Sequence, residues 1–455
     1  MTTNTTTAIS SHFQRALNFH KLGKLQLAVE AYSRSIKQEP SHLGSYINLG
    51  SALRSLGKFD SARLCYQRAI ILSENDASVL SNYGNLLCDM GLYIEAEAIH
   101  KKVLELDGKS QGYLYNAAIV PFSNNKPKEA IQHFNDIIKH EPEHINANWN
   151  RGLSFLQLGQ FENGFKGYEW RLKLVNVPER VFDKPRWKKE SLKGKTILLT
   201  AEQGFGDMLQ FARFIPLIAD KAKNVIVECR PELMLIMKSV KGVSEVVRID
   251  DSLPEYDFYL PLLSVPNQLK ISLNNVPADA PYFSVEPMAK KYLPVSQHKR
   301  LRIGLIWAGK LTPKDRSCDL ENFLPLMQNS NVTFYSFQLG PRRDDISTLG
   351  ADAFIYDMSG SIKDFSDTAG FMQHMDLIIT IDSAAAHLAG ALGLPTWLLL
   401  LHSSDWRWML DTNQSPWYPS MQLFRQTKYN DWSECVTQVH TAFNKWMKSN
   451  IEKLN

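Results

Sequence analysis

The stretch DLIITIDSAAAHLAGALGLPTWLLLL, residues 376–401, decides how the second half of this chain folds. Its apolar length approaches the roughly 20 residues that a membrane helix needs. Asp382 and His387 would then lie deep in hydrocarbon, and glycines and a proline punctuate the run as in water-soluble proteins. We therefore expect a strand, a turn, a helix, a turn and a second strand, at residues 377–381, 382–383, 384–392, 393–395 and 396–401. The N-terminus of that helix would face the ligand of the unit.

The composition is that of a globular protein with more than one domain. A chain of 455 residues, 44% hydrophobic and 22% charged, is long enough for two or three buried cores and is not generally disordered. Its net charge of +4 is too small to indicate nucleic-acid binding. The N-terminus has neither the basic nor the apolar region of a secretory signal, so we expect a cytoplasmic protein without a membrane span.

The cysteines indicate neither disulfides nor a metal site. They are odd in number and without a close pair, which predicts buried thiols in a reducing compartment, at Cys65, Cys88, Cys229, Cys318 and Cys435. The sequence also lacks a His-Glu-x-x-His motif and a close carboxylate pair, so we expect no metal and no cofactor.

The first third of the chain repeats itself every 34 residues. One column holds small residues that permit close helix crossing, at Ala28, Ala62, Ala96, Ala130 and Gly164. A second column holds rings, at Tyr32, Tyr66, His100, Phe134 and Tyr168. A third holds residues suited to a left-handed turn, at Gly23, Gly57, Gly91, Asn125 and Gly159. The pattern matches tetratricopeptide repeats, about five of them in residues 1–175, and Pro121 predicts a kinked or shortened helix in the fourth.

A ladder of side-chain amides follows the first helices of the repeats, at Asn48, Asn82, Asn116 and Asn150. On the concave face of such an array these amides can pair with the backbone of an extended peptide. Asparagine is also common at this position for packing or solvation alone, and both roles stay open.

The repeat period is lost after residue 175, and prolines with a basic cluster predict a solvated linker over residues 176–194. We expect a first Rossmann-like lobe over residues 195–290, with strands at 196–200, 225–228, 246–249 and 258–260 and a helix at 207–219. We expect a second lobe over residues 291–455, with strands at 302–308, 332–338 and 377–381. Two such halves in succession describe the α/β GT-B architecture, here preceded by an α-helical solenoid.

The loop after the first of these strands carries the candidate chemistry, in Gln203, Gly204, Gly206 and Asp207. Its glycines invite a dinucleotide-binding interpretation, but Leu209 is too bulky for the third glycine position and Asp207 would repel a pyrophosphate. Asp207 can instead take the proton of an acceptor hydroxyl, or it can simply cap the following helix.

Four segments together resemble bacterial heptosyltransferase-like glycosyltransferases (glycosyltransferase family nine): AEQGFGDMLQFARFIPL at 201–217, IGLIWAG at 303–309, IDSAAAHLAGALGLPTW at 381–397 and DWRWMLDTNQSPWYP at 405–419. More narrowly, the chain resembles the members fused to tetratricopeptide repeats and the repeat-bearing protein O-glycosyltransferases, which hold polypeptide on an asparagine ladder. The loop KLTPKDRSCDL after Gly309 is shorter and less basic than the family pattern. Which cation meets the donor phosphates therefore stays open.

The resemblance implies an inverting, metal-independent transfer from a nucleotide-sugar, with Asp207 as the general base. It implies a donor site in the second lobe, at Trp307, Gly309, Lys314, Arg316, Asp382, Ser383, Ala384, Ala385 and His387. Backbone N–H groups at residues 383–385 would meet the phosphates, and Lys314 or Arg316 would neutralise them. Each side chain also has a plainer role, since Asp382 can cap the helix, His387 can pack in the core and both cations can be solvated.

The implied acceptor is a polypeptide selected by the repeats, and flagellin or another surface protein fits by analogy. Arrays of this kind also often form homo-oligomers. Two alternatives stay open: the same chemistry on a lipid-linked or saccharide acceptor, and a tetratricopeptide interaction scaffold whose second half has lost turnover.

Overall fold

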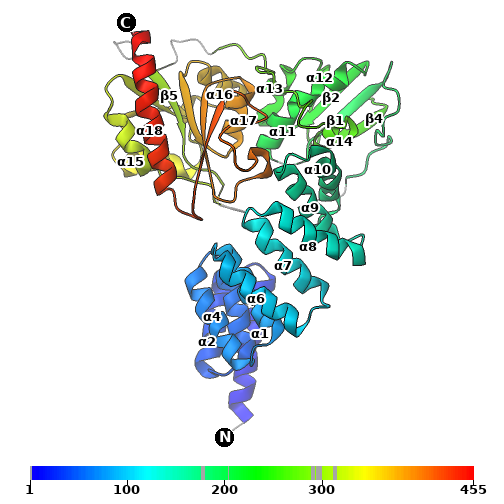
Figure 1. Ribbon diagram of the computed structural model, residues 1–455, viewed down its shortest axis with the longest axis vertical. Coiled ribbons are helices and arrows are strands. Elements are labelled where there is room, and N and C mark those ends of the chain that lie inside the picture. Colours follow the sequence, from blue (N-terminus) through cyan, green and yellow to red (C-terminus); the bar gives the residue numbers. More distant parts are fainter. Residues whose placement is uncertain are drawn as a thin grey trace. The chain divides into compact units, whose positions relative to one another are not determined.

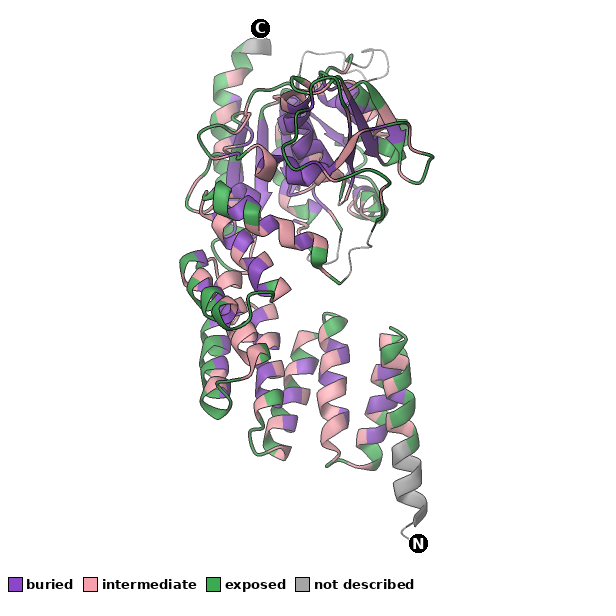
Figure 2. Ribbon diagram, turned by 90° about the vertical axis from the view of Figure 1, so that its right-hand side faces the viewer, coloured by how far each residue is buried: buried purple, intermediate pink, exposed green. Residues whose placement is uncertain are grey.

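The computed structural model describes residues 3–175, 180–202, 204–287, 293, 300–310 and 315–454 (Figure 1). The chain forms two compact units, residues 1–154 and 155–455. Buried residues follow one face of each repeat helix in the first unit and fill the sheets of the second (Figure 2).

All the secondary-structure elements described in the first unit are helices. Its helices are α1 (Thr3–Lys21), α2 (Leu25–Gln38), α3 (Leu43–Ser55), α4 (Phe59–Leu72), α5 (Ala77–Asp89), α6 (Tyr93–Leu106), α7 (Gln111–Ser123), α8 (Pro127–His140) and the first part of α9 (Ile145–Gln157). From α1 to α8 they pack as successive pairs, and the alanines of the small-residue column are fully buried between them. The turn column has left-handed backbone as predicted, with φ of 69°, 72°, 73° and 56° at Gly23, Gly57, Gly91 and Asn125.

Of the two outcomes predicted for Pro121, a kinked or a shortened helix, the shortened helix is wrong. The helix α7 has 13 residues, as many as α3 and α5. Pro121 lies in its last turn, where the missing N–H removes one helical bond at an end that is about to stop.

His100 makes the repeat unit sensitive to acid. Its ring is 1% exposed, both ring nitrogens lack a hydrogen-bond partner in the described structure, and a Cβ added to Gly84 would lie 2.6 Å from Nε2. Burial lowers the pKa of His100 from 6.5 to about 4, so the unfolded chain takes up this proton at a higher pH than the folded chain. The contribution of His100 to the free energy of unfolding is therefore fully present above pH 6.5 and is lost as the pH falls toward 4. At about 1.4 kcal/mol per pKa unit, the loss is about 3 kcal/mol.

We expect His100→Phe to remove this loss, since Phe134 already fills the same column of a neighbouring repeat. Urea unfolding of both proteins from pH 7.5 to pH 4 measures the difference in the free energy of unfolding. If the free energies of unfolding of the two proteins differed by the same amount at every pH in this range, His100 would not be the source of the acid sensitivity.

The second unit begins with the last helix of the repeat pattern, α10 (Phe161–Tyr168), followed by the short helix η1 (Glu169–Lys173). The Phe161 ring stacks on Trp417 with 5.1 Å between centroids, and Gly159 takes the predicted left-handed turn with φ of 73°. The division between the units thus lies inside α9, ahead of the boundary predicted after residue 175.

A four-stranded parallel sheet follows, in the order β3-β2-β1-β4, with strands β1 (Thr196–Thr200), β2 (Asn224–Cys229), β3 (Glu245–Arg248) and β4 (Phe258–Pro261). Its helices are α11 (Phe205–Phe211), α12 (Ile215–Ala219), α13 (Met234–Lys238) and α14 (Val265–Gln268). The predicted helix at 207–219 is interrupted between α11 and α12 by a 3-10 turn, η2 (Ala212–Phe214). Pro216 explains the break, because it has no N–H and its ring would collide with the carbonyl of Ala212 in a continuous helix.

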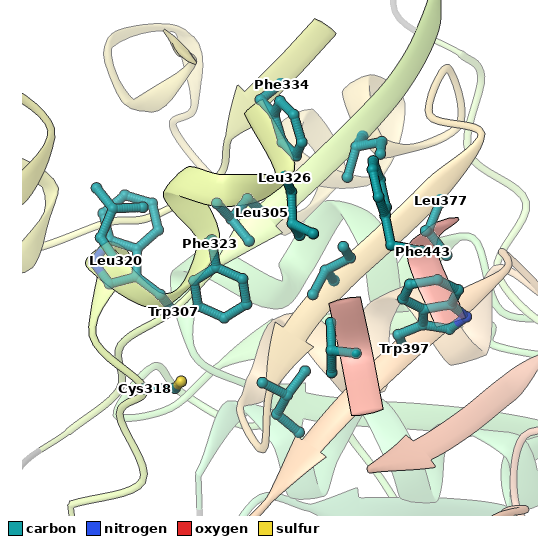
Figure 3. Packing of buried hydrophobic residues seen from close by; sticks show 14 of the residues in the cluster. Leu305, Trp307, Cys318, Leu320, Phe323, Leu326, Phe334, Leu377, Trp397 and Phe443 are labelled. Carbon is teal, nitrogen blue, oxygen red and sulfur yellow. The ribbon is translucent and has the colours of Figure 1, made fainter. Parts of the chain in front are cut away.

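A six-stranded parallel sheet completes the unit, in the order β10-β9-β8-β5-β6-β7. Its strands are β5 (Leu301–Ile306), β6 (Val332–Ser336), β7 (Ile355–Asp357), β8 (Leu377–Ile381), β9 (Thr396–Leu400) and β10 (Met421–Arg425). Its helices are α15 (Asp345–Thr348), α16 (Phe365–Met372), α17 (Ala384–Ala391) and α18 (Ser433–Asn450). Figure 3 shows one core of this sheet, a hydrophobic cluster that includes Leu305, Trp307, Trp397 and Phe443 of α18.

The stretch at residues 376–401 folds as predicted. Strand β8, helix α17 and strand β9 follow one another, and Gly393 makes the second turn with φ of 71°. In the described part of the chain no helix has the length and apolar character to cross a bilayer. Four cysteines are buried thiols as predicted, whereas Cys65 is half-buried.

Residues 180–194 are mostly exposed, as predicted for a solvated linker, but Trp187 and Leu192 are buried and residues 185–187 bond to β4 of the four-stranded sheet. Trp187 is 4% exposed, and its backbone N–H donates to the Tyr259 carbonyl at 2.9 Å. The Arg180 guanidinium holds both oxygens of Glu228, at 2.6 and 2.7 Å. The segment thus buries Trp187 beside the edge strand β4 and pairs the buried Glu228 carboxylate of the inner strand β2.

Candidate active site

Each sheet has a point at which the strand order reverses. In the six-stranded sheet this point lies between β5 and β8, and in the four-stranded sheet between β1 and β4. Open parallel α/β sheets bind ligands at such points, outside the carboxyl ends of the strands. Residues 202–207 follow β1, residues 307–309 follow β5 and residues 382–383 follow β8. The predicted site segments therefore occupy the positions that the topology favours for a ligand.

Asp207 caps α11 and is paired across the unit. Its Oδ2 accepts the Gly204 N–H at 2.9 Å, which is the capping role, and its Oδ1 lies 2.5 Å from Nη2 of Arg407. Burial raises the pKa of the Asp207 carboxyl, against the opposing effect of Arg407 and with a further increase from Asp405. A carboxylate oxygen accepts more than one hydrogen bond, so both oxygens keep capacity for a hydroxyl proton.

The turn before α17 is built around a buried carboxylate. Asp382 is 6% exposed, and its Oδ2 lies 3.1 Å from Nη1 of Arg316. Burial raises the pKa of Asp382, and Arg316 opposes the rise. Ser383 is the N-cap of α17 with extended backbone, and its buried hydroxyl has no hydrogen-bond partner in the described structure. The first N–H groups of α17 belong to Ala384 and Ala385. The side chains of these residues are single methyl groups, so a ligand can approach the backbone closely.

His387 lies where the loop after β1 of the first sheet meets the helix after β8 of the second sheet. Its Nδ1 lies 2.9 Å from the Tyr418 hydroxyl and its ring stacks on Trp408 at 5.2 Å. Burial, with nearby guanidinium groups, lowers the pKa of His387 well below its usual value, so the ring is neutral. It therefore supplies packing and a hydrogen-bonding ring at this place, not a positive charge.

The loop of Asp207 and the turn of Asp382 lie in contact. A Cβ built on Gly206 would lie 2.8 Å from Cδ2 of His387 and 3.5 Å from Cα of Ala384. Helices α11 and α17 are neighbours in Figure 1 and pack along much of their length. Glycine at position 206 is thus required by the approach of the second sheet, and not by dinucleotide binding.

Two of the predicted donor residues, Trp307 and Gly309, follow β5 and are bonded within the second sheet's own region. The Trp307 side chain is fully buried in the core of the six-stranded sheet, and its Nε1 donates to Asp345 at 2.8 Å. The Trp307 ring therefore belongs to the core of the sheet. This corrects its predicted place in a donor site, because a fully buried ring cannot contact a donor. Gly309 lies at the strand end and its N–H donates to the Ser317 hydroxyl at 3.2 Å. Gln203 and Lys314 lie outside the described residues.

The structure adds Arg407, to which the sequence assigned no role. It follows β9, the neighbour of β8, in the short helix η9 (Trp406–Trp408). The signal was present, since charged residues that follow parallel strands gather at one edge of a sheet. Its partner Asp207 lies 200 positions earlier, and nothing in a single sequence pairs the two.

A second unpredicted ion pair holds the start of the Asp207 loop. The Arg171 guanidinium, 1% exposed, binds both oxygens of Glu202 at 2.9 and 2.6 Å and also donates to Ser264. Arg171 lies in η1, directly after α10. The end of the repeat pattern thus fixes the loop that carries Asp207.

The asparagine ladder is engaged in packing in the first unit. The Asn116 amide nitrogen donates to the Ser81 hydroxyl at 3.0 Å, and that of Asn150 donates to the Tyr115 hydroxyl at 2.7 Å. The Asn48 nitrogen donates to the Gly44 carbonyl of its own helix, and Asn82 is half-buried. In Asn48, Asn116 and Asn150 these bonds use the nitrogen, so the packing role is present and the side-chain oxygens are the groups to test for peptide.

Within the described ranges no three His, Cys, Asp or Glu side chains are placed to hold a metal ion. The site described here is composed of carboxylates, guanidinium groups, a neutral imidazole and backbone N–H groups.

Comparison with known proteins identifies the repeats. Models of the tetratricopeptide repeat match residues 13–77 and 77–106. Among solved structures, the chain is similar to the MamA protein (TM-score 0.32, 18% identity, 37% of this chain and 98% of that one) and to YrrB, a tetratricopeptide protein with an unusual peptide-binding site (0.30, 15%, 37% and 91%).

A curated relative reaches beyond the repeats. Protein FlbA of Caulobacter vibrioides is 25% identical over 322 residues, which cover 64% of this chain and 54% of that protein. The chain thus spans about half the length of this relative, and a coverage of 64% exceeds what residues 1–154 alone supply. This chain is a protein with N-terminal tetratricopeptide repeats, followed by an α/β region of two parallel sheets, and it is distantly similar to FlbA.

Proposed function

We propose that the chain is an inverting, metal-independent glycosyltransferase of GT-B architecture that moves a sugar from a nucleotide-sugar to a polypeptide. The observation that carries the proposal is the contact between the Asp207 loop and the turn before α17, each at the switch point of its own sheet. One offers a carboxylate with a raised pKa, and the other offers backbone N–H groups beside Arg316. A general base and a diphosphate site are the two parts that such a transfer needs.

In the proposed step, the oxygen of an acceptor hydroxyl attacks the anomeric carbon of the donor sugar. The bond from that carbon to the diphosphate breaks, and the nucleoside diphosphate leaves with the electron pair. Asp207 takes the hydroxyl proton, while N–H groups at residues 383–385 and the Arg316 guanidinium stabilise the charge on the leaving group. Attack opposite the leaving group inverts the anomeric configuration.

The repeats support a protein as acceptor, since tetratricopeptide arrays present extended surfaces to protein partners. We expect side-chain oxygens of the asparagine ladder to accept N–H groups of an extended segment, as the resemblance to repeat-bearing protein O-glycosyltransferases implies. Flagellin or another surface protein is the acceptor that analogy favours.

An interaction scaffold without turnover is the second candidate. It is favoured by the bonding of Asp207, whose two oxygens are both held by protein groups. A scaffold needs no nucleotide, so nucleotide-sugar binding separates it from the enzyme.

The test is calorimetry of the full chain with UDP-, GDP-, ADP-, CMP- and dTDP-sugars. We expect one nucleotide class to bind, and Arg316→Gln to weaken that binding by about tenfold or more, because a charge-assisted hydrogen bond to phosphate is lost. Arg248→Gln, which changes a half-exposed arginine on β3, is the matched control and should leave the affinity unchanged. Absence of binding to every donor would remove the basis of the enzyme proposal.

A further inference from the structure

Arg407 is the most completely bonded cation of the candidate site. Its side chain is 8% exposed. Its Nη2 lies 2.5 Å from Asp207, its Nη1 lies 2.8 Å from Asp405 and its Nε donates to the Gln210 oxygen at 2.5 Å. Every nitrogen of the guanidinium thus has a protein partner, and two of these partners lie on α11. Such a group is fixed in place, in contrast to the half-exposed Arg316.

An aromatic wall behind Arg407 fixes it further. Its guanidinium lies over the Trp406 ring, 4.5 Å from the centroid. Trp406 in turn packs edge-on against three rings of α10, at 6.5, 5.9 and 5.9 Å from Phe161, Phe165 and Tyr168. The last helix of the repeat pattern therefore braces the residue that binds Asp207.

We propose that Arg407 is a positioning residue for Asp207, which holds the carboxylate in one orientation and keeps it ionised for the acceptor hydroxyl. This inference rests on the proposed function, because positioning has a purpose only if Asp207 is the base. Three of the five guanidinium N–H groups of Arg407 are bonded, to Asp207, Asp405 and Gln210, so the group cannot turn toward a second anion without losing these bonds. The donor diphosphate is therefore left to Arg316 and the N-terminus of α17.

The charges around Asp207 decide what loss of Arg407 would do. Arg407 and the more distant Arg316 favour the carboxylate, as does the Gly204 N–H, whereas Asp405 and burial disfavour it. His387, across Gly206, is neutral and contributes no charge. Without Arg407 the balance consists mainly of burial and a second carboxylate, so the proton affinity of Asp207 must rise.

The test compares Arg407→Gln with Arg407→Lys in the full chain, using the donor found by calorimetry. We expect Arg407→Gln to lower kcat at least tenfold and to move the acidic limb of the kcat/KM profile up by at least one pH unit. Donor KM should stay within about twofold, since the diphosphate is bound elsewhere. Arg407→Lys should return the acidic limb of the kcat/KM profile to its wild-type pH, because the positive charge returns. Its kcat should stay reduced, because an ammonium group cannot replace the planar guanidinium that bonds to three partners at once. A fall in kcat with an unmoved acidic limb in Arg407→Gln would overturn the inference, since a purely structural role predicts that result.

A titration that needs no turnover separates this inference from the proposed function. In protein labelled with carboxyl-13C aspartate, the resonance missing from Asp207→Asn identifies Asp207. We expect its titration to move to higher pH by at least one unit in Arg407→Gln and to return in Arg407→Lys. An unmoved titration overturns the role of Arg407, whereas a moved titration in a chain that transfers no sugar overturns only the glycosyltransferase.

Discussion

Asp207→Asn is expected to lower kcat by 10²- to 10⁴-fold, the usual contribution of a general base. The carboxamide keeps the size of the side chain and an oxygen to accept the Gly204 N–H, but it cannot take the acceptor proton. Donor affinity, measured by calorimetry, should remain within about threefold. In the wild type the rate should fall as the pH drops through the Asp207 pKa, which burial raises above the usual carboxyl value.

The control for Asp207→Asn is Asp364→Asn. Asp364 caps α16 by accepting the N–H groups of Ser366 and Asp367, at 2.8 and 2.9 Å, and has no part in the proposed step. Both substitutions keep an oxygen that can accept the capping N–H groups, since asparagine caps a helix about as well as aspartate. Equal rates for the two variants would show that Asp207 is a cap and not a base.

Phe161→Ala is expected to lower the free energy of unfolding of the second unit by about 3–5 kcal/mol, as for other buried phenylalanines. The Phe161 ring is 1% exposed, stacks on Trp417 at 5.1 Å and meets Phe165 and Trp406 edge-on. Its loss leaves a cavity next to Trp406, on which the Arg407 guanidinium lies. Urea unfolding followed by hydrogen exchange of segments in each unit measures where the loss falls.

The matched variant is Phe134→Ala, which removes a fully buried ring of α8 in the first unit. We expect a similar loss there, with exchange in β1 and β8 unchanged. If Phe161→Ala left the strands of the second unit as protected as in the wild type, α10 would not belong to that unit's core.

Elements whose signal lies in neighbouring residues were predictable from the sequence. Strands β1 and β8 match the predicted ranges residue for residue, because each is a short run of buried β-branched and leucine residues bounded by turn formers. The turns inside the repeats were predictable because a fixed period places Gly or Asn at the left-handed position between the two helices of each repeat. The candidate site was predictable in part, since Asp207, Asp382 and His387 all follow strands of parallel sheets.

Features that depend on a partner distant in the sequence were not predictable. The edge strands β7 and β10 were missed. Strand β7 has three residues of which two are exposed, and β10 contains an exposed and a half-buried polar residue, whereas the inner strands β8 and β9 are buried throughout. The resemblance to the glycosyltransferase family placed Trp307 in the donor site, but its indole is buried in the core and donates to Asp345. Arg407 and Arg171 could not be assigned, because their carboxylate partners lie 200 and 31 positions away.

The most direct test of sugar transfer to a polypeptide is intact-mass analysis of surface proteins from cells that carry the wild-type gene, a deletion or Asp207→Asn. The account predicts at least one protein whose mass is greater by a sugar residue in the wild type alone, with the mass restored by the wild-type gene and not by Asp207→Asn. A protein profile that is identical in all three strains, or a modification that Asp207→Asn restores in full, would contradict it.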